Sequence, residues 1–340
     1  MGVPPPPCAG WEGCGFRYIT KQKGDAMYKY IGKRILQMFL ALFLISVFVF
    51  ALLQMIPGDP VYAMLGDEIS IERHDQVYRE MRLDRPLPEQ YAVWMKGFIG
   101  GDMGYSFSYR KPVAELVAAR LPTTMYLGVL SSLVSVALGV LFGAVTAVKR
   151  GTWVDNVVTV ISNIGLATPI FWLGILLVLV FSLKLGWLPS NGFTFPWEDF
   201  GLSVRQTIMP VICMSIGGVA SYTRQTRSSM LEVIRQDYIR TARSKGLPEG
   251  RVIWKHALKN ALIPILTLIA VTLRNTIAGA AVVENVFNIN GMGSLMVQCI
   301  TKRDFQLVQA CILLLSAVTC VCNLLVDIAY AYVDPRIRLK

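Results

Sequence analysis

The strongest constraint on the fold of this chain is a series of long apolar runs between residues 35 and 333. A helix needs about 20 consecutive apolar residues to cross the roughly 30 Å of hydrocarbon in a bilayer. Because 54% of the residues are hydrophobic and only 16% are charged, the chain has the composition of a multi-span membrane protein. Five runs meet the length, and they are Ile35–Leu53, Met125–Val148, Val157–Phe181, Ala261–Val283 and Leu307–Val333.

A sixth span is predicted at Thr207–Tyr222, which is shorter and contains one proline and two glycines. Such a helix needs neighbouring helices to shield its backbone. The charge pattern requires it, because only with six spans do the basic N-terminal flank, the 149–156 turn, the 223–260 loop and the basic C-terminal tail share one side. The fold class predicted from the sequence is therefore an all-α membrane protein with six transmembrane helices.

The orientation follows from the 223–260 loop, which carries nine Lys or Arg residues against three acidic ones. The positive-inside rule places this face and both chain termini in the cytoplasm, so residues 54–122, 184–206 and 284–306 lie outside. The net charge of +11 is explained in the same way. We expect membrane lipid, and no nucleic acid, to meet these basic residues.

Residues 1–26 contain four consecutive prolines at positions 4–7 and no long apolar core, so they differ from a cleavable signal peptide. A disordered N-terminal tail is expected here, followed by a permease domain over residues 27–340. The sequence leaves open whether translation begins at Met1 or at Met27.

Several enzyme and metal sites are excluded by what the chain lacks. No lysine is followed by Ser or Thr, so there is no phosphate-binding G-x-x-x-x-G-K-[ST] loop, and any ATPase must be another chain. His74 and His256 fall on opposite sides of the predicted membrane, and no two cysteines have C-x-x-C spacing, so no metal site is expected. A membrane enzyme is left without a catalytic set, since there is also no G-x-S-x-G motif.

A channel or secondary transporter is the second class of function considered. Ion-coupled transport usually needs carboxylates at mid-depth or an internal inverted repeat. The charged residues inside the spans are few, namely Arg274 in the fifth and Asp327 near the inner end of the sixth. A membrane scaffold is the third class of function, but a scaffold would not explain the pair of helices predicted in the cytoplasmic loop.

That cytoplasmic loop predicts two short helices with a fixed break. Apolar residues recur at three- and four-residue steps, which indicates an amphipathic helix over 231–245. Gly246 suits the left-handed end of this helix, and Pro248 suits the first turn of the next. The packing positions predicted for the first helix are Leu231, Ile234, Tyr238 and Ala242, and those predicted for the second are Val252, Ile253, His256 and Ala257.

The loop resembles the coupling loop of ABC importer permeases, in which Glu-Ala-Ala is followed after three residues by Gly and after nine more by Ile-x-Leu-Pro. In this chain the triad is Arg240-Thr241-Ala242, and the spacing to Gly246 is kept. His256-Ala257-Leu258-Lys259 stands at the distal end, and a proline follows only at Pro264. Only Ala242, Gly246 and Leu258 match literally, and the departures resemble the peptide and nickel subgroup.

Further segments extend the resemblance over most of the chain from Met27 onward, to the first-type (B-type) permease of dipeptide, oligopeptide and nickel ABC importers. They are "IPGDP" (56–60), "RLDRPLPEQYAVW" (82–94), "GDMGYSF" (101–107), "LPTTMYL" (121–127), "DYIRTARSKGL" (237–247), "VVENVFNINGMG" (282–293) and "NLLVDIAYAYVDPRIR" (323–338).

The resemblance implies a type I ABC importer permease fold in the cell membrane of a bacterium or archaeon. It also implies four kinds of partner: a second homologous permease, two cytoplasmic ATPase subunits that use ATP and Mg, an extracytoplasmic solute-binding protein, and lipid. This chain itself is expected to bind no cofactor. Peptides are the expected substrate, and nickel or a metal chelate is the alternative.

Two sets of site residues follow from these expectations. The ATPase-coupling residues are Asp237, Tyr238, Arg240, Thr241, Ala242, Lys245, Gly246 and Leu247. The residues expected to line the translocation path are Asn163, Thr168, Arg274, Asn275 and Thr276. In the first outer segment, residues 70–84 predict an amphipathic surface helix, which either receives the binding protein or caps the spans.

Overall fold

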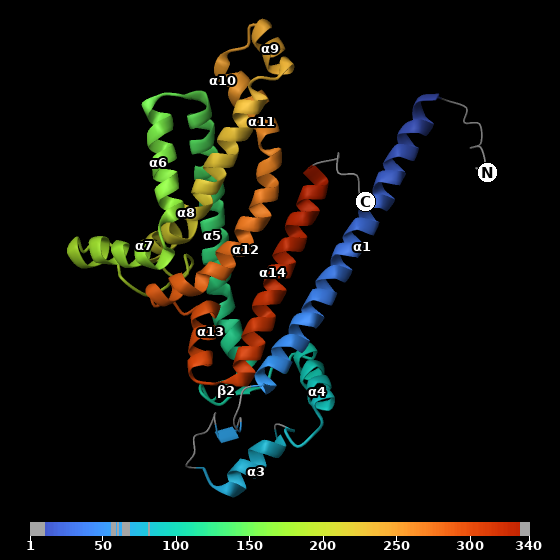
Figure 1. Cartoon of the computed structure of the whole chain (residues 1–340), viewed down its shortest axis with the longest axis vertical. Helices are drawn as coiled ribbons and strands as arrows, with labels where there is room; N and C mark the ends of the chain where they lie inside the picture. The colour runs from blue at the N-terminus through green and yellow to red at the C-terminus, as the bar shows by residue number, and fades with distance from the viewer. Residues whose placement is uncertain (1–10, 56–58, 60, 63–68, 81, 334–340) are drawn as a thin grey trace.

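The computed structural model describes residues 11–55, 59, 61–62, 69–80 and 82–333, with the backbone alone at 11–30, 267, 270, 273–275, 277–278 and 329–333. Most of these residues lie in helices, as predicted (Figure 1). Within the described part, four helices contain a segment long and apolar enough to cross a membrane. They are α1 (Trp11–Gln54), α5 (Val113–Val148), α8 (Phe200–Val233) and α14 (Phe305–Val333). A further helix, α12 (Ile263–Val286), coincides with the predicted fifth span.

The third predicted span is bent rather than straight. Its first part is α6 (Trp153–Ala167), and its second part is α7 (Ile170–Leu177) continued by the π-helical segment η1 (Val178–Lys184). The two parts meet at 106°. Pro169 has no N–H to donate and forces Thr168 into an extended conformation, with ψ 123°. The apolar run predicted as the third span is therefore divided into two helices at this proline, and Figure 1 shows α7 projecting sideways from the bundle.

The short sixth span predicted at Thr207–Tyr222 is the middle of α8, a helix of 34 residues. The side chain of Asp199 caps its first turn by accepting a hydrogen bond from the N–H of Leu202 (2.9 Å). Half of the most apolar segment of α8 is buried, a larger share than in α1, α5 or α14. Neighbouring helices therefore shield the backbone around Pro210, as the sequence requires.

Residues 11–26 differ from the expected disordered tail, because they are helical and continuous with α1. Residues 1–10 lie outside the described part of the chain. No proline stands between Pro7 and Pro57, and extending an existing helix adds one hydrogen bond for each residue that is fixed. The apolar span thus provides a nucleus from which the helix extends toward the N-terminus.

Helices α5 and α8 make the most extensive helix–helix contact among the described residues, and glycines allow it. A Cβ on Gly139 would lie 2.4 Å from the Cβ of Tyr222, and one on Gly143 would lie 2.7 Å from the carbonyl oxygen of Thr223. The two glycines form a G-x-x-x-G pattern, which brings membrane helices into backbone contact. On α8, Gly218 meets Ser135 of α5 in the same way.

The bundle has two distinct ends. We call the end that carries the 223–260 loop the basic end; Figure 1 places there the first turns of α1, the α5–α6 turn, the loop helices and the last turns of α14. The opposite end carries α3 (Ile71–Glu80), α4 (Leu87–Ile99), the two-residue strands β1 (Tyr105–Ser106) and β2 (Lys111–Pro112), and α13 (Met292–Thr301). The described basic segments thus share one end, as the six-span prediction requires, while the basic tail residues 336–340 lie outside the described part of the chain.

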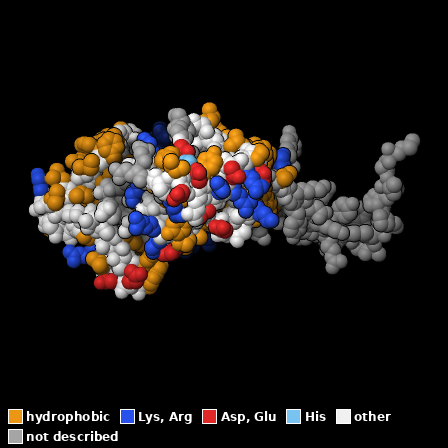
Figure 2. All heavy atoms as spheres, turned by 90° about the horizontal axis from the view of Figure 1, so that it is seen from below, with side chains coloured by type: hydrophobic (Ala, Val, Ile, Leu, Met, Phe, Trp, Pro, Cys, Tyr) orange, Lys and Arg blue, Asp and Glu red, His pale blue; other side chains and the backbone are white. Residues whose placement is uncertain are grey.

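Seen from the α3–α4 end, the molecule displays basic and acidic side chains side by side (Figure 2). The amphipathic helix predicted at 70–84 is confirmed as α3, whose Val77 is buried while Glu72 and Arg79 are exposed. The strands β1 and β2 pair antiparallel, with Tyr105 opposite Pro112. This end therefore presents folded surface elements rather than bare loops.

Helix α3 is fastened to the preceding segment through His74. The ring of His74 stacks on Tyr62 with centroids 4.5 Å apart, and on Tyr78 at 5.8 Å. Its Nε2 lies 2.9 Å from Asp59 Oδ2 and its Nδ1 lies 3.2 Å from Asp75 Oδ1. The hydrogen bond with Asp59, and then that with Asp75, raises the pKa of His74.

We expect these contacts between α3 and the preceding segment to weaken as pH rises. Because the folded-state pKa of His74 is raised, its charged contacts contribute fully below about pH 6.5 and are lost as pH climbs through the higher folded value. Although burial opposes ionisation of Asp59, its hydrogen bonds with His74 and Val61 hold its pKa below the usual value, so it stays charged in this range. Amide hydrogen exchange in Ile71–Glu80, corrected for intrinsic rates, should be faster at pH 8.5 than at pH 5.5. In a His74→Gln variant that pH dependence should vanish; equal protection at both pH values in the unmodified protein contradicts the prediction.

Candidate functional site

The basic end carries a compact projection, residues 234–261, which we call the knob. Its helices are α9 (Asp237–Ser244), α10 (Glu249–Arg251), the π-helical segment η2 (Val252–Ala257) and α11 (Leu258–Ala261). Figure 1 shows α9 and α10 at the tip of the molecule, beyond the ends of α6 and α12.

The first knob helix is shorter than predicted. A single helix over 231–245 is wrong, because α8 ends at Val233 and the chain turns before α9 begins. Tight hydrogen bonds form this turn, from Arg235 N to Glu232 O (3.3 Å) and from Gln236 N to Val233 O (3.1 Å). The turn redirects α9 so that Ile239, rather than the predicted Tyr238, becomes its fully buried residue.

The predicted break between the knob helices is confirmed. Gly246 has φ 75°, the left-handed conformation that glycine adopts most easily, and its N–H donates to Arg243 O (2.9 Å). Pro248 then precedes the first turn of α10. Arg243 bridges the break by donating two hydrogen bonds to Glu249, at 3.1 and 2.6 Å. These bonds lower the pKa of Glu249, so the carboxylate stays charged at neutral pH.

A buried apolar cluster makes the knob stiff and joins it to the bundle. Ala147, in the last turn of α5, packs into the same cluster, as does Met230 of α8. Of the packing positions predicted for the second helix, Val252, Ile253 and Ala257 are buried, and His256 is half-buried. The buried cluster comprises Ala147, Met230, Ile239, Ala242, Val252, Ile253, Ala257 and Ala261. The knob therefore packs directly on the ends of α5 and α8.

The predicted coupling residues divide into an exposed and an inward-facing set. The side chains of Asp237 and Arg240 are 93% and 79% exposed and form an ion pair at 3.5 Å. Tyr238 is 44% exposed and accepts a hydrogen bond from Asn260 Nδ2 (3.0 Å). The structure also exposes Thr241, Lys245 and Gly246, whereas Ala242 is buried and Leu247 packs against the knob cluster. The exposed members present a polar, aromatic and basic surface at the tip.

Next to the knob, a two-bond ion pair ties α6 to α8. Arg227 Nε and Nη2 donate to the two oxygens of Asp155, each at 2.8 Å, and the N–H of Gly151 donates to the same carboxylate at 3.1 Å. The Asp155 side chain is only 5% exposed. Such charge-assisted, two-point contacts fix both position and orientation. The bent third span is therefore attached to the helix that leads into the knob.

Of the five predicted path residues, the structure describes the side chains of Asn163, Thr168 and Thr276. Asn163 is exposed on α6, while Thr168 and Thr276 donate their hydroxyls to the carbonyls of Ile164 (2.7 Å) and Thr272 (2.9 Å) in their own helices. The backbones of Arg274 and Asn275 lie in α12, but their side chains lie outside the described part of the structure.

A buried carboxylate that the sequence analysis missed connects three helices at the α3–α4 end. Glu284, at the end of α12, is fully buried, accepts a hydrogen bond from Thr124 Oγ1 of α5 (2.5 Å) and another from the N–H of Ser294 in α13 (2.8 Å). The same Thr124 oxygen accepts from the N–H of Met292 (2.8 Å). A Cβ on Gly291 would lie 2.2 Å from the carboxylate carbon, so only glycine leaves room for this arrangement.

The signal for Glu284 was present within the "VVENVFNINGMG" segment. The predicted fifth span ended at Val283, one residue before it, so its charge was assigned to an outer loop. Gly291 and Gly293 of the same segment leave room for the Glu284 carboxylate and for the backbone of Ala281, which allows α13 to pack closely against α12.

Comparisons with known proteins agree with this arrangement. Residues 139–339 match the family model described as "binding-protein-dependent transport system inner membrane component", and residues 27–128 match the model of the N-terminal region of such membrane components. A Brucella abortus (strain 2308) protein whose name describes a peptide transport system permease is 38% identical over 307 residues, covering 90% of this chain and 98% of that protein. The oligopeptide transport system permease protein AppB of Bacillus subtilis (strain 168) is 37% identical over 315 residues, covering 92% of this chain and all of AppB.

Among solved structures, an inward-facing MetNI methionine ABC transporter contains a similar chain. It superposes with a TM-score of 0.54 at 18% identity, covering 64% of this chain and 96% of that one. At this identity the likeness concerns the fold alone.

Proposed function

Because this chain belongs to the family of binding-protein-dependent transport system inner membrane components, the permease subunits of ABC importers, we propose that it forms half of a translocation path for short peptides. The chain is a transport subunit and not an enzyme. The names of its relatives in Brucella abortus and Bacillus subtilis support peptides as the cargo. The other half of the path comes from a second, homologous permease.

The observation that carries this proposal is the construction of the knob. A solvated loop between two spans needs neither a buried core nor an ion pair across its break, and the knob has both. A stiff projection with an exposed tip fits the groove of another protein. The protein that supplies this groove is a cytoplasmic ATPase subunit, which hydrolyses ATP with Mg²⁺. Each permease contacts one such subunit.

Force then enters the bundle through the knob. Closure of two ATPase subunits around ATP displaces α9, and the shared cluster carries the displacement to α5 and α8. To move a two-state equilibrium from 1:99 to 99:1, the ATP-bound subunits must favour one state by about 5.5 kcal/mol. A flexible loop would change its own conformation instead of transmitting this free-energy preference to the spans. The Arg243–Glu249 ion pair and the buried Ile239 keep the knob rigid enough to transmit it.

The two ends of the bundle receive different partners. The basic end faces the cytoplasm and its anionic lipid, with both chain termini on that side of a bacterial or archaeal inner membrane. The α3–α4 end faces outward and meets the solute-binding protein through the mixed charges seen in Figure 2. The path lies between the two permeases and is lined by Asn163, Thr168, Arg274, Asn275 and Thr276.

Purification of the chain with its partner subunits tests this function. We expect the ATPases and the second permease to co-purify, and peptide-loaded binding protein to stimulate ATP hydrolysis and peptide uptake into vesicles. The same vesicles supplied with empty binding protein are the control. Ion or peptide flux through the lone chain without ATP indicates a channel or secondary transporter instead, and stimulation by nickel or a metal chelate but not by peptide changes the cargo.

A further inference from the structure

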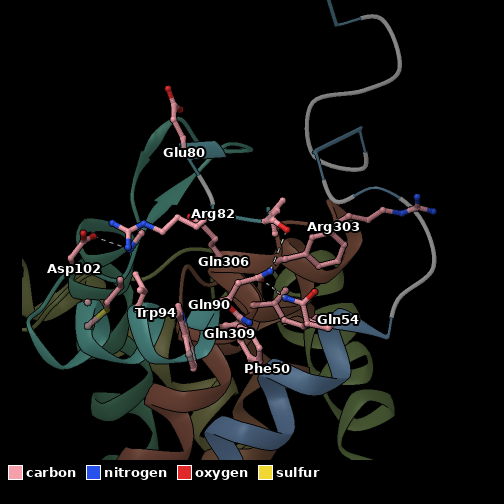
Figure 3. Close-up of a pocket in the computed structure, with 18 of the residues that line it drawn as sticks. Phe50, Gln54, Glu80, Arg82, Gln90, Trp94, Asp102, Arg303, Gln306 and Gln309 are labelled. Atoms are coloured by element: carbon pink, nitrogen blue, oxygen red, sulfur yellow. Dashed lines mark hydrogen bonds between the residues drawn. The ribbon is translucent and has the colours of Figure 1, made fainter. Parts of the chain in front are cut away.

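The α3–α4 end contains a cavity of about 670 Å³ that no step of the proposed function uses. It lies between the end of α1, helix α4, the end of α13 and the start of α14 (Figure 3). Its volume falls in the range of about 300–1,000 Å³ typical of small-molecule sites. None of the residues proposed for the path lines it.

Two arginines that line the cavity have an unusual backbone. Arg82 and Arg303 have φ of 56° and 54°, the left-handed conformation that follows the ends of α3 and α13. Their N–H groups close those helices by donating to Arg79 O (2.9 Å) and Ile300 O (3.1 Å). Glycine is the residue that adopts this position with least strain. The chain instead keeps a cationic side chain at both places, and neither guanidinium forms an ion pair with any described residue.

The charges are unevenly distributed along the cavity. In Figure 3, Arg82 extends toward Asp102 at one side, while Arg303 extends the opposite way, on the side of Gln54. Among the described residues that line the cavity, Asp102, Glu80 and Arg82 give one side both signs of charge, and Arg303 is the charged residue on the other side. A ligand with an ammonium group at one end and a carboxylate at the other matches this layout.

Amide side chains line the cavity between its two charged sides. Gln54 donates to Gln90 at 3.2 Å, and Gln306 accepts from the N–H of Tyr105 at 2.9 Å, so the Gln54 and Gln306 side chains retain further donors and acceptors. The amide nitrogen of Gln90 is already bonded to Arg85 O (2.8 Å). Phe50 and Trp94 stack with centroids 6.0 Å apart and supply an apolar wall. Side-chain amides match the hydrogen-bonding pattern of peptide bonds, and the aromatic wall suits small apolar side chains.

We infer that this cavity is an accessory binding site for a short peptide with free termini, separate from the translocation path. The peptide carboxylate pairs with Arg303, its ammonium group meets Asp102, and its amides bond to the glutamines. Such a site holds peptide at the α3–α4 end of the permease without the solute-binding protein.

Calorimetric titration of the purified full-length chain tests the inference, with trialanine as the probe. Trialanine is expected to bind saturably at millimolar concentration, and trialanine amide and N-acetyl-trialanine about tenfold more weakly, because each loses one charge-assisted contact. These comparisons need no variant and so do not depend on the folding of a mutant. Absence of saturable trialanine binding, or equal binding of all three peptides, overturns the inference.

Variants then assign the contacts. Arg303→Gln should weaken trialanine about tenfold while leaving the amide unchanged, and Asp102→Asn should weaken trialanine while leaving the acetylated peptide unchanged. Arg110→Gln is the matched control, because Arg110 also has a left-handed backbone, with φ 53°, at the same end but does not line the cavity. An equal effect of Arg110→Gln and Arg303→Gln contradicts the assignment. ATP-driven uptake by the assembled importer is measured separately, so loss of accessory binding and failure of the proposed transport function give different results.

Discussion

Replacing Gly293 with alanine is expected to destabilise the folded protein strongly. A Cβ at this position would lie 2.3 Å from the Cα of Ala281 and 2.7 Å from its nitrogen. Backbone atoms cannot swing aside as the end of a flexible side chain can, so α13 must separate from α12. That separation also pulls Ser294 away from Glu284. We expect a loss of about 3 kcal/mol, the upper end of the usual range for overpacking, visible as a lower thermal unfolding temperature and poor recovery from membranes.

Gly279 provides the matched control for this change. It lies in α12, and a Cβ there would meet no atom within 4 Å. Gly279→Ala should therefore be neutral or stabilising by up to about 1 kcal/mol, since alanine favours a helix interior over glycine. Equal unfolding temperatures for the two variants exclude the close α12–α13 contact as a determinant of stability.

Replacing Gly246 with valine is expected to abolish uptake while the protein still folds. No atom lies within 4 Å of a Cβ at this position, so the cost arises from the backbone alone. A left-handed conformation costs an ordinary residue about 1–2 kcal/mol, and a β-branched one tolerates it poorly. The strain is relieved if the turn opens, which shifts α9 relative to α10 and breaks the Arg243–Glu249 bridge. The measurements are peptide uptake, ATP hydrolysis and thermal unfolding of the reconstituted importer.

Gly250 is the control in the same loop. A Cβ there also meets nothing within 4 Å, and its φ lies outside the left-handed region. Gly250→Val should transport peptide nearly as well as the unmodified protein. If Gly246→Val also transports normally, the fixed break has no part in coupling.

The positions of the long apolar helices, and the gathering of their basic flanks at one end, could be predicted because both depend on composition. Apolar length sets which segments cross a membrane, and the distribution of basic residues sets which ends lie together. The bend at Thr168–Pro169 was equally visible as a proline in the sequence, but a proline in a span either kinks a helix or ends it. The contacts of the surrounding helices decide between the two outcomes, and these contacts are not local. The helical state of residues 11–26 was missed for a similar reason, since the nucleus lies further along the chain.

The candidate site was predictable where local chemistry determines it. Gly246 and Pro248 constrain their own backbones, so the break was found at the right residues. The burial of Ile239 in place of Tyr238 depends on the turn before α9. The spacing of apolar residues in the sequence does not predict this turn. Glu284 was missed because its burial arises from partners 160 residues earlier, at Thr124, and 10 residues later, at Ser294.

The glycine contact between α5 and α8 has a mechanical consequence. Helix α5 has 36 residues and is about 54 Å long, and side-by-side backbone contact with α8 prevents either helix from bending or sliding alone. The pair behaves as a stiff rod, with Ala147 in the knob cluster near one end and Thr124 at the Glu284 network toward the other. A tilt of about 5° displaces one end of such a rod by roughly 5 Å relative to the other. A small rotation imposed at one face of the membrane is thereby delivered to the opposite face with little loss.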